Sequence, residues 1–190
     1  MADNALFIWT ESMNIGIPVI DGQHRLLMEL INRLYLSVVR RESQTATSQI
    51  LDELIDYTRV HFTLEEQLLE DVGYESTDLE QHRQVHRRFV ERIEQAAERH
   101  LGEGKSVSFE LISLLKHWLK EHILITDRRY ADALRAAGVL TADGVLHIDG
   151  VEIAETLSDP SAPGQAIAAA NDAGRAWWKI WHFPLRSRAR

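Results

Sequence analysis

The stretch HFTLEEQLLEDVGYESTDLEQHRQVH, residues 61–86, holds three of the chain's nine histidines and decides how the sequence is interpreted. His61 and Glu65 are four residues apart, and so are His82 and His86. Residues four apart on an α-helix point the same way, so each pair could present two metal-binding atoms together. A surface polar pair or satisfied core histidines would explain either pair taken alone, so the rest of the chain has to decide.

Apolar residues recur at helical spacing in four segments, which cover about residues 20–41, 46–71, 78–101 and 107–136. In the last segment Trp118, His122 and Ile125 fall on one face, whereas His117, five residues before His122, faces away from it toward solvent. Glycines follow the second and third segments, as is typical of helix ends. Short connections favour antiparallel neighbours. The sequence therefore predicts an all-α fold, an up-down-up-down four-helix bundle.

Alternating helix directions bring the metal-competent side chains to one end of this bundle. With a rise of about 1.5 Å per residue, a histidine near the start of the first helix lies level with residues near the end of the second. The third helix starts at that end and the fourth returns to it. Seven candidate ligands meet there: His24, His61, Glu65, His82, His86, His122 and Asp127.

Composition narrows the chemistry and the location. The chain has no cysteine, so any metal must be held by nitrogen and oxygen, which suit iron, zinc, copper or manganese. Its formal net charge of -8 argues against a nucleic-acid partner. The N-terminus lacks the features of a signal peptide, and no apolar run is long enough to span a bilayer. We therefore expect a cytoplasmic protein.

The last third of the chain differs in charge from the rest. Residues 136–174 carry six acids and no Lys or Arg, whereas residues 175–190 carry five bases, no acid and three of the five tryptophans. This shift predicts a bundle domain at residues 1–135 and a C-terminal extension at 136–190. The stretch GVLTADGVLHIDGVEI, residues 138–153, has two Asp-Gly turn signals and predicts a small hairpin. Residues 175–190 predict a terminal amphipathic helix that binds a membrane surface or a protein partner, unless its tryptophans fold back onto the bundle.

Four motifs, in chain order, resemble the hemerythrin family and in particular its bacterial members. These are IGIPVIDGQH (15–24), HFTLEEQLL (61–69), HRQVHRRF (82–89) and WLKEHILITDRRY (118–130). The resemblance covers about residues 7–131. It implies a non-haem centre of two irons per chain, bridged by an oxo or hydroxo group, Glu65 and Asp127. One iron would be held by His82, His86 and His122, and the other by His24 and His61 with one position left open for O2.

The resemblance further implies reversible O2 binding. We expect this binding to serve carriage, storage or delivery without enzymatic turnover, and we expect a monomer. Leu119 lies one turn before His122 and would close the O2 pocket together with Trp118. The alternative is an O2 or redox sensor that signals to a partner through the C-terminal extension. Ferritin-like di-iron oxidases fit less well, because no histidine here follows a Glu at their Glu-x-x-His spacing, and a two-zinc hydrolase would need a further acid or base.

Overall fold

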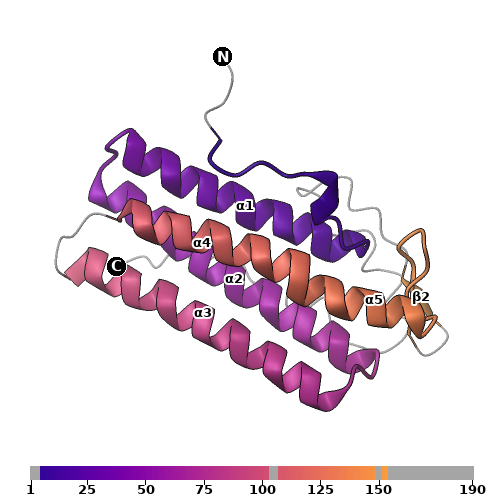
Figure 1. Ribbon diagram of the computed structural model, residues 1–190. Helices are drawn as coiled ribbons and strands as arrows, with labels where there is room; N and C mark the ends of the chain where they lie inside the picture. Colours follow the sequence, from indigo (N-terminus) through magenta and orange to yellow (C-terminus); the bar gives the residue numbers. More distant parts are fainter. Residues whose placement is uncertain (1–4, 103–106, 149–150, 154–190) are drawn as a thin grey trace.

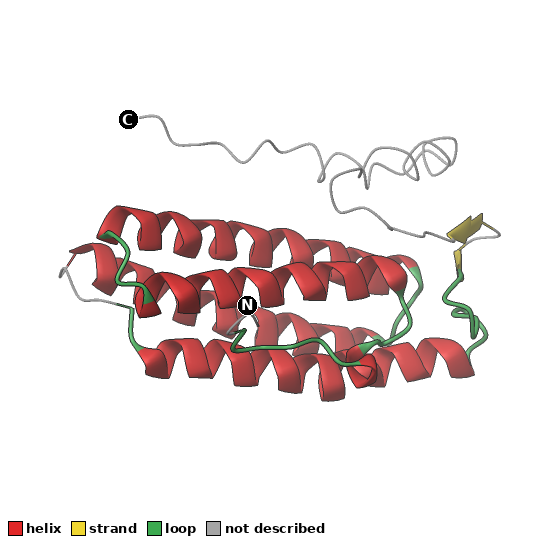
Figure 2. Cartoon of the chain, turned by 90° about the horizontal axis from the view of Figure 1, so that it is seen from above, coloured by secondary structure: helices red, strands yellow, loops and turns green. Residues whose placement is uncertain are grey.

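The computed structural model describes residues 5–102, 107–148 and 151–153, and within them the all-α bundle is confirmed. The helices are α1 (Pro18–Val39), α2 (Gln44–Asp71), α3 (Ser76–Gly102) and α4 (Phe109–Glu121), followed by the π-helix η2 (His122–Asp127) and by α5 (Arg128–Ala136). Helices α1 to α4 run side by side and alternate in direction, and η2 and α5 continue the line of α4 (Figures 1 and 2). The ends of α2 and α3 predicted from the sequence lie within two residues of those observed.

Local chemistry sets the helix boundaries. Pro18 occupies the first turn of α1, where its missing N–H costs nothing. Ser43 caps α2 by accepting a hydrogen bond from Ala46 N at 3.2 Å, and Ser108 caps α4 in the same way. Gly73 follows α2 with a φ of 71°, which a glycine adopts without strain.

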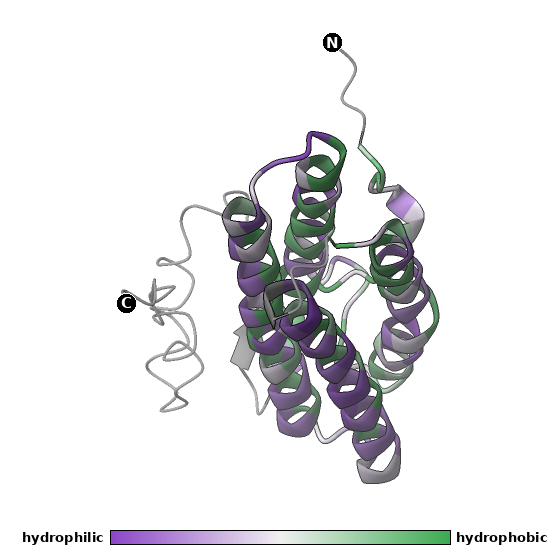
Figure 3. Cartoon of the chain, turned by 90° about the vertical axis from the view of Figure 1, so that its left-hand side faces the viewer, coloured by the Kyte–Doolittle hydropathy of each residue, from purple (hydrophilic) through white to green (hydrophobic). Residues whose placement is uncertain are grey.

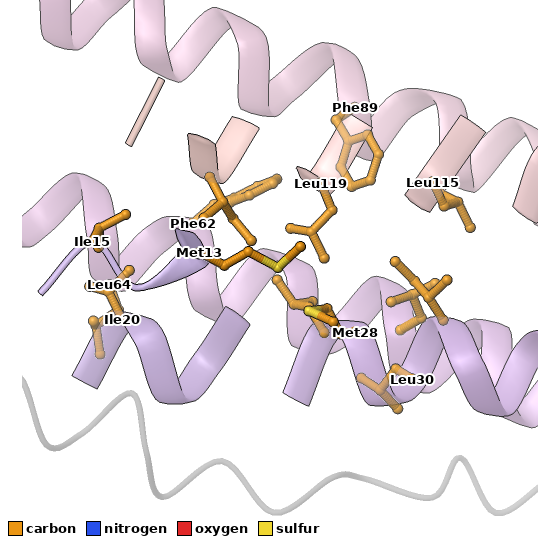
Figure 4. Packing of buried hydrophobic residues seen from close by; sticks show 14 of the residues in the cluster. Met13, Ile15, Ile20, Met28, Leu30, Phe62, Leu64, Phe89, Leu115 and Leu119 are labelled. Carbon is orange, nitrogen blue, oxygen red and sulfur yellow. The ribbon is translucent and has the colours of Figure 1, made fainter. Parts of the chain in front are cut away.

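The core between the helices changes character along the bundle. Away from the predicted ligands it is aliphatic, and Leu34, Leu51 and Leu115 are at most 1% exposed. Burial of each such leucine side chain stabilises the fold by about 1.5–3 kcal/mol. Hydrophobic and hydrophilic residues share each helix (Figure 3), and Figure 4 shows buried hydrophobic side chains meeting between the helices.

The fourth helix differs from its prediction. Instead of one α-helix over residues 107–136, α4 passes through the wider turn of η2 before α5 continues. The prediction that Ile125 shares the core face of His122 is wrong, because Ile125 is 67% exposed. The extra residue of a π turn shifts the angular position of the residues within it, so the α-helical spacing used for Ile125 does not apply.

An N-terminal strap, defined as residues 5–17 and including the short 3-10 helix η1 (Glu11–Met13), lies against the bundle. Side chains of the helices bind its backbone. Asn32 donates to Phe7 O at 2.7 Å and accepts from Phe7 N at 2.8 Å. Arg128 donates to the carbonyls of Ser12 (2.6 Å) and Asn14 (2.9 Å). The strap is thereby joined both to α1 and to the residue that follows η2.

The predicted hairpin is confirmed. Strands β1 (Leu146–Ile148) and β2 (Val151–Ile153) pair antiparallel, with Leu146 opposite Ile153. Leu140 and Leu146 are 3% and 2% exposed and belong to the core of the bundle. The predicted terminal amphipathic helix, residues 175–190, lies outside the described residues. Among the described residues, no helix is long and apolar enough to cross a membrane.

Candidate metal centre

All seven predicted ligands lie at the same end of the bundle, and all are buried. His24 comes from α1, His61 and Glu65 from α2, His82 and His86 from α3, and His122 and Asp127 from η2. None is more than 5% exposed. They form two groups that share Glu65, one with His82, His86 and His122 and one with His24 and His61. We call these the three-histidine half and the two-histidine half.

The three-histidine half brings its donor atoms within hydrogen-bonding distance of one another. Nε2 of both His82 and His86 lies 3.2 Å from Glu65 Oε2. The Nε2 atoms of His86 and His122 lie only 2.9 Å apart. Imidazole nitrogens that face each other so closely must share a proton or bind a common cation.

The two-histidine half meets the other through Asp127. Its Oδ1 lies 3.0 Å from His122 Nε2, and its Oδ2 lies 3.3 Å from His24 Nε2. The rings of His24 and His61 meet edge to face at 4.8 Å between centroids. One oxygen of Asp127 thus faces each half, as a bridging carboxylate would.

The π turn explains how His122 and Asp127 share a site although they are five residues apart. Two residues that are five positions apart on an α-helix point to different sides. His117 is five residues before His122 in α4, and it is exposed, as predicted. In η2 the wider turn brings the fifth residue back to the same side. A single-turn π-helix of this kind is frequent at functional sites.

The site leaves buried polar atoms without hydrogen-bond partners. Among the described residues, His24 Nε2, His61 Nε2 and both carboxylate oxygens of Asp127 are buried and form no hydrogen bond. Each such atom costs about 1–3 kcal/mol when nothing compensates it. They point toward one another, and they are the nitrogen and oxygen donors that a borderline metal ion prefers. The residues present therefore fit a bound cation.

Burial and neighbouring charges shift the pKa values of these groups in different directions. Burial lowers the pKa of His24 to about 4 and holds that of His61 and His122 well below the usual range. Burial alone would lower the pKa of His86, but its hydrogen bonds to Glu65 and Glu66 raise it. In the two-histidine half, both imidazoles are therefore neutral and ready to bind metal at neutral pH.

The two carboxylates of the site also diverge. Burial raises the pKa of Asp127, and the neighbouring charge of Glu65 raises it further. Burial also opposes ionisation of Glu65, but the charge of His82 and hydrogen bonds from His82 and His86 outweigh it and lower the pKa of Glu65. Without a cation, Glu65 is the carboxylate that carries the negative charge.

Three residues around the predicted ligands were missed in the sequence. Gln23 Oε1 accepts from His61 Nδ1 at 2.9 Å, and Glu66 Oε1 accepts from His86 Nδ1 at 2.7 Å. Each bond fixes the tautomer that turns Nε2 into the site. Tyr130, 1% exposed, donates to Glu65 Oε1 at 2.5 Å. The sequence did offer a signal for these three residues: Gln23 and Glu66 directly adjoin a predicted ligand, and Tyr130 lies about one helical turn after another.

The predicted pocket residues flank the site from α4. Leu119 is 1% exposed, and Figure 4 shows it among the buried side chains near Phe62 and Met13. Trp118 is half-buried and stacks on the ring of His122, with centroids 4.4 Å apart and planes at 13°. Their role in an O2 pocket stays a prediction.

Comparison with known proteins shows the family of the chain. Residues 15–134 match the model of the hemerythrin HHE cation binding domain. The chain belongs to the hemerythrin family. The hemerythrin match contains all seven predicted ligands and covers more than half of the chain.

Individual relatives agree with the family. The chain is 38% identical over 132 residues to a bacteriohemerythrin of Stenotrophomonas maltophilia, which covers 70% of this chain and 84% of the relative. It is 31% identical over 126 residues to a myohemerythrin of Theromyzon tessulatum, covering 66% and 92%. A crystal structure of wild-type hemerythrin superposes with a TM-score of 0.63 at 25% identity, covering 68% of this chain and 98% of that one.

Proposed function

We propose that this hemerythrin-family chain binds O2 reversibly at a non-haem di-iron centre held by all seven predicted ligands. The observation that carries the proposal is the pair of ligand groups sharing Glu65, with one oxygen of Asp127 toward each half. When bound as a ferrous pair, the two ions would supply the two electrons that reversible O2 binding requires. Five imidazoles and two carboxylates suit iron.

The unequal halves support an open position on one iron. The three-histidine half offers one more imidazole than the two-histidine half, while Glu65 belongs to both and Asp127 turns one oxygen toward each. We infer that O2 binds on the side of His24 and His61. Both residues are 0% exposed, so water reaches this side only through the protein.

Residues around the ligands hold them in one orientation. Gln23 and Glu66 each accept the Nδ1 proton of a ligand histidine, and Tyr130 donates to the oxygen of Glu65 that does not contact His82. Such partners typically contribute about 10–100-fold to metal affinity. In the described part of the site, neither group contains a histidine or carboxylate beyond the predicted ligands. Binding without turnover is the simpler expectation.

Carriage, storage or delivery of O2 is the primary proposal, and sensing is the second. The sensor alternative is favoured by the way the extension joins the bundle. A Cβ on Gly144 would lie 3.1 Å from Gly16 O of the strap. Arg128, the residue directly after Asp127, donates a hydrogen bond to Ser12 O of the same strap. A monomeric state and a cytoplasmic location remain predictions from the sequence.

Reconstitution tests the proposal. The metal-free chain is loaded with ferrous iron without oxygen, its iron is counted, and O2 uptake and release are followed through repeated cycles of aeration and deoxygenation. We expect two irons and one O2 per chain, with full release. Irreversible O2 consumption, or a single iron per chain at saturation, would contradict it.

A further inference from the structure

Three aromatic contacts lead from the predicted ligands toward the surface. Phe62 stacks on His86 with centroids 3.6 Å apart. Tyr130, which is hydrogen-bonded to Glu65, meets Tyr74 at 6.4 Å. Trp118 stacks on His122 at 4.4 Å and, on its other side, on Phe89 of α3 at 3.6 Å.

The charges at two of these exits are balanced or acidic. Phe62 lines a groove of about 290 Å³ between α2 and α3, where Arg59 and Arg87 are matched by Glu66 and Glu91. Tyr74 lies near two carboxylates, Glu75 and Asp78, and one base, Arg129. Neither surface carries an excess of positive charge that would attract an anionic partner.

The third exit has unpaired arginines. Arg88 and Arg92 are four residues apart and therefore lie on the same side of α3. Phe89 is three residues before Arg92, so this side is next to Phe89. Both are exposed and form no ion pair with any described residue, whereas Arg83 and Arg87 on the opposite side of α3 pair with Glu70 and Glu80.

One exposed carboxylate, Glu121, follows Trp118 by three residues, so the two arginines leave an excess of one positive charge there. We call Arg88, Phe89, Arg92 and Trp118 the α3–α4 seam. Its positive charge stands out on a chain of net charge -8.

We propose that the α3–α4 seam docks an acidic electron-transfer protein and that Trp118 is where its electrons enter the site. The inference rests on the proposed di-iron function. A carrier that has lost its electrons to O2 must regain two, so two reduced donors would each give one electron and convert two ferric ions to ferrous. A ring stacked between a ligand and the surface shortens the gap that each electron crosses, and the arginines attract the donor's carboxylates.

Binding is tested on the metal-free full chain, so that failure of the iron assignment cannot affect the result. The probe is a small acidic [2Fe–2S] ferredoxin, titrated at low ionic strength and followed by calorimetry. The variant Arg88→Gln/Arg92→Gln is compared with Arg40→Gln/Lys120→Gln, which removes two exposed positive charges elsewhere that form no ion pair with any described residue. We expect the seam variant to weaken binding at least about fivefold and the control less than about twofold. Equal affinities, or stronger binding of a basic cytochrome than of the ferredoxin, would overturn the proposal.

The role of Trp118 needs a second measurement on the iron-loaded, oxidised chain. At saturating ferredoxin, where a change in affinity does not limit the rate, Trp118→Leu should slow reduction several-fold, and Trp118→Phe should recover part of the rate. Dithionite, which is small enough to reach the centre without docking, serves as the control and should reduce neither variant more slowly than the parent, because a smaller side chain at Trp118 does not narrow the O2 pocket. Loss of rate with both reductants would show that Trp118 is only structural and would sink the electron-entry role.

Discussion

The two halves of the predicted metal site are built from the same kinds of ligand in different surroundings. The three-histidine half lies among aromatic rings, with Phe62 on His86 and Trp118 on His122, and His86 also bonds an ionisable partner, Glu66. The two-histidine half has a neutral amide, Gln23, as the partner of His61. The difference indicates that one half is fixed by rigid neighbours and coupled to protons, whereas the other is kept neutral and one ligand short.

Removing the shared carboxylate should break both halves at once. Glu65 belongs to both groups, so Glu65→Ala takes a donor from each and leaves buried histidines facing one another. We expect the iron content to fall from two per chain to nearly none, measured by atomic absorption after loading. Glu53→Ala, on the exposed side of the same helix where it pairs with Arg33, should retain two irons. Two irons in the Glu65 variant would mean that this carboxylate does not bridge.

A single histidine from the crowded half should have the next largest effect. His82→Ala removes one of three imidazoles and also the hydrogen bond to Glu65 Oε2. Because ligand geometry is coupled to metal retention, assembly of the whole site should be impaired and iron should fall below about one per chain. His117→Ala, on the exposed side of α4, is the matched control. Full loading of the His82 variant would exclude it as a ligand.

The partner of His86 tests the proton coupling that separates the halves. Glu66→Gln removes a carboxylate that raises the pKa of His86, so iron binding should release fewer protons near neutral pH and depend less on pH. We also expect iron affinity to fall about 10-fold or more. Gln23→Leu should lower affinity without changing the pH dependence, since the pKa of His61 is lowered by burial. Identical pH profiles for the parent and Glu66→Gln would contradict the assigned difference.

The pair of His86 and Glu66 also determines how the stability of the metal-free chain changes with pH. The raised pKa of His86 means that the folded metal-free chain binds this proton more tightly than the unfolded chain does. Its contribution is fully present below the unfolded value of about 6.5 and is lost as pH rises through the folded value. Glu66→Gln should therefore destabilise the metal-free chain more in mild acid than in mild alkali, as measured by urea unfolding.

The smallest effect on iron content is expected at Leu119, whose removal should affect the reactivity of the site. Leu119→Ala opens a cavity beside the ligands and costs about 2–5 kcal/mol of stability, yet both irons should remain. Water and anions should enter more easily and accelerate autoxidation, followed by loss of the O2-bound form over time. Leu115→Ala, one turn earlier and 0% exposed, makes a similar cavity away from the ligands. Equal autoxidation in the two variants would place Leu119 outside the O2 pocket.

Much of this architecture could be predicted from spacing alone. Apolar periodicity predicted the four helices, and counting residues along them brought His24, His61 and His82 to one end. The π turn could not be predicted, because the same five-residue spacing separates His117 from His122 in an α-helix and joins His122 to Asp127 in η2. Sequence periodicity assumes one helix type throughout, so it misplaced Ile125 on the core face.

The partners of the ligands lay beyond sequence reasoning for a different reason. Tyr130 meets Glu65 across 65 positions of the chain, and Gln23 meets His61 across 38. Such contacts depend on how two helices are rotated against each other. Periodicity shows which side of a helix is buried, but not which individual side chain reaches across to its neighbour.

The central claim, two metal positions with unequal ligand sets, is tested most directly by an iron-edge anomalous difference map from crystals of the iron-loaded chain. The account predicts two peaks. One would lie within bonding distance of His82, His86 and His122, the other of His24 and His61, and Glu65 and Asp127 would contact both. A single peak, or two peaks with equal numbers of histidines, would contradict it.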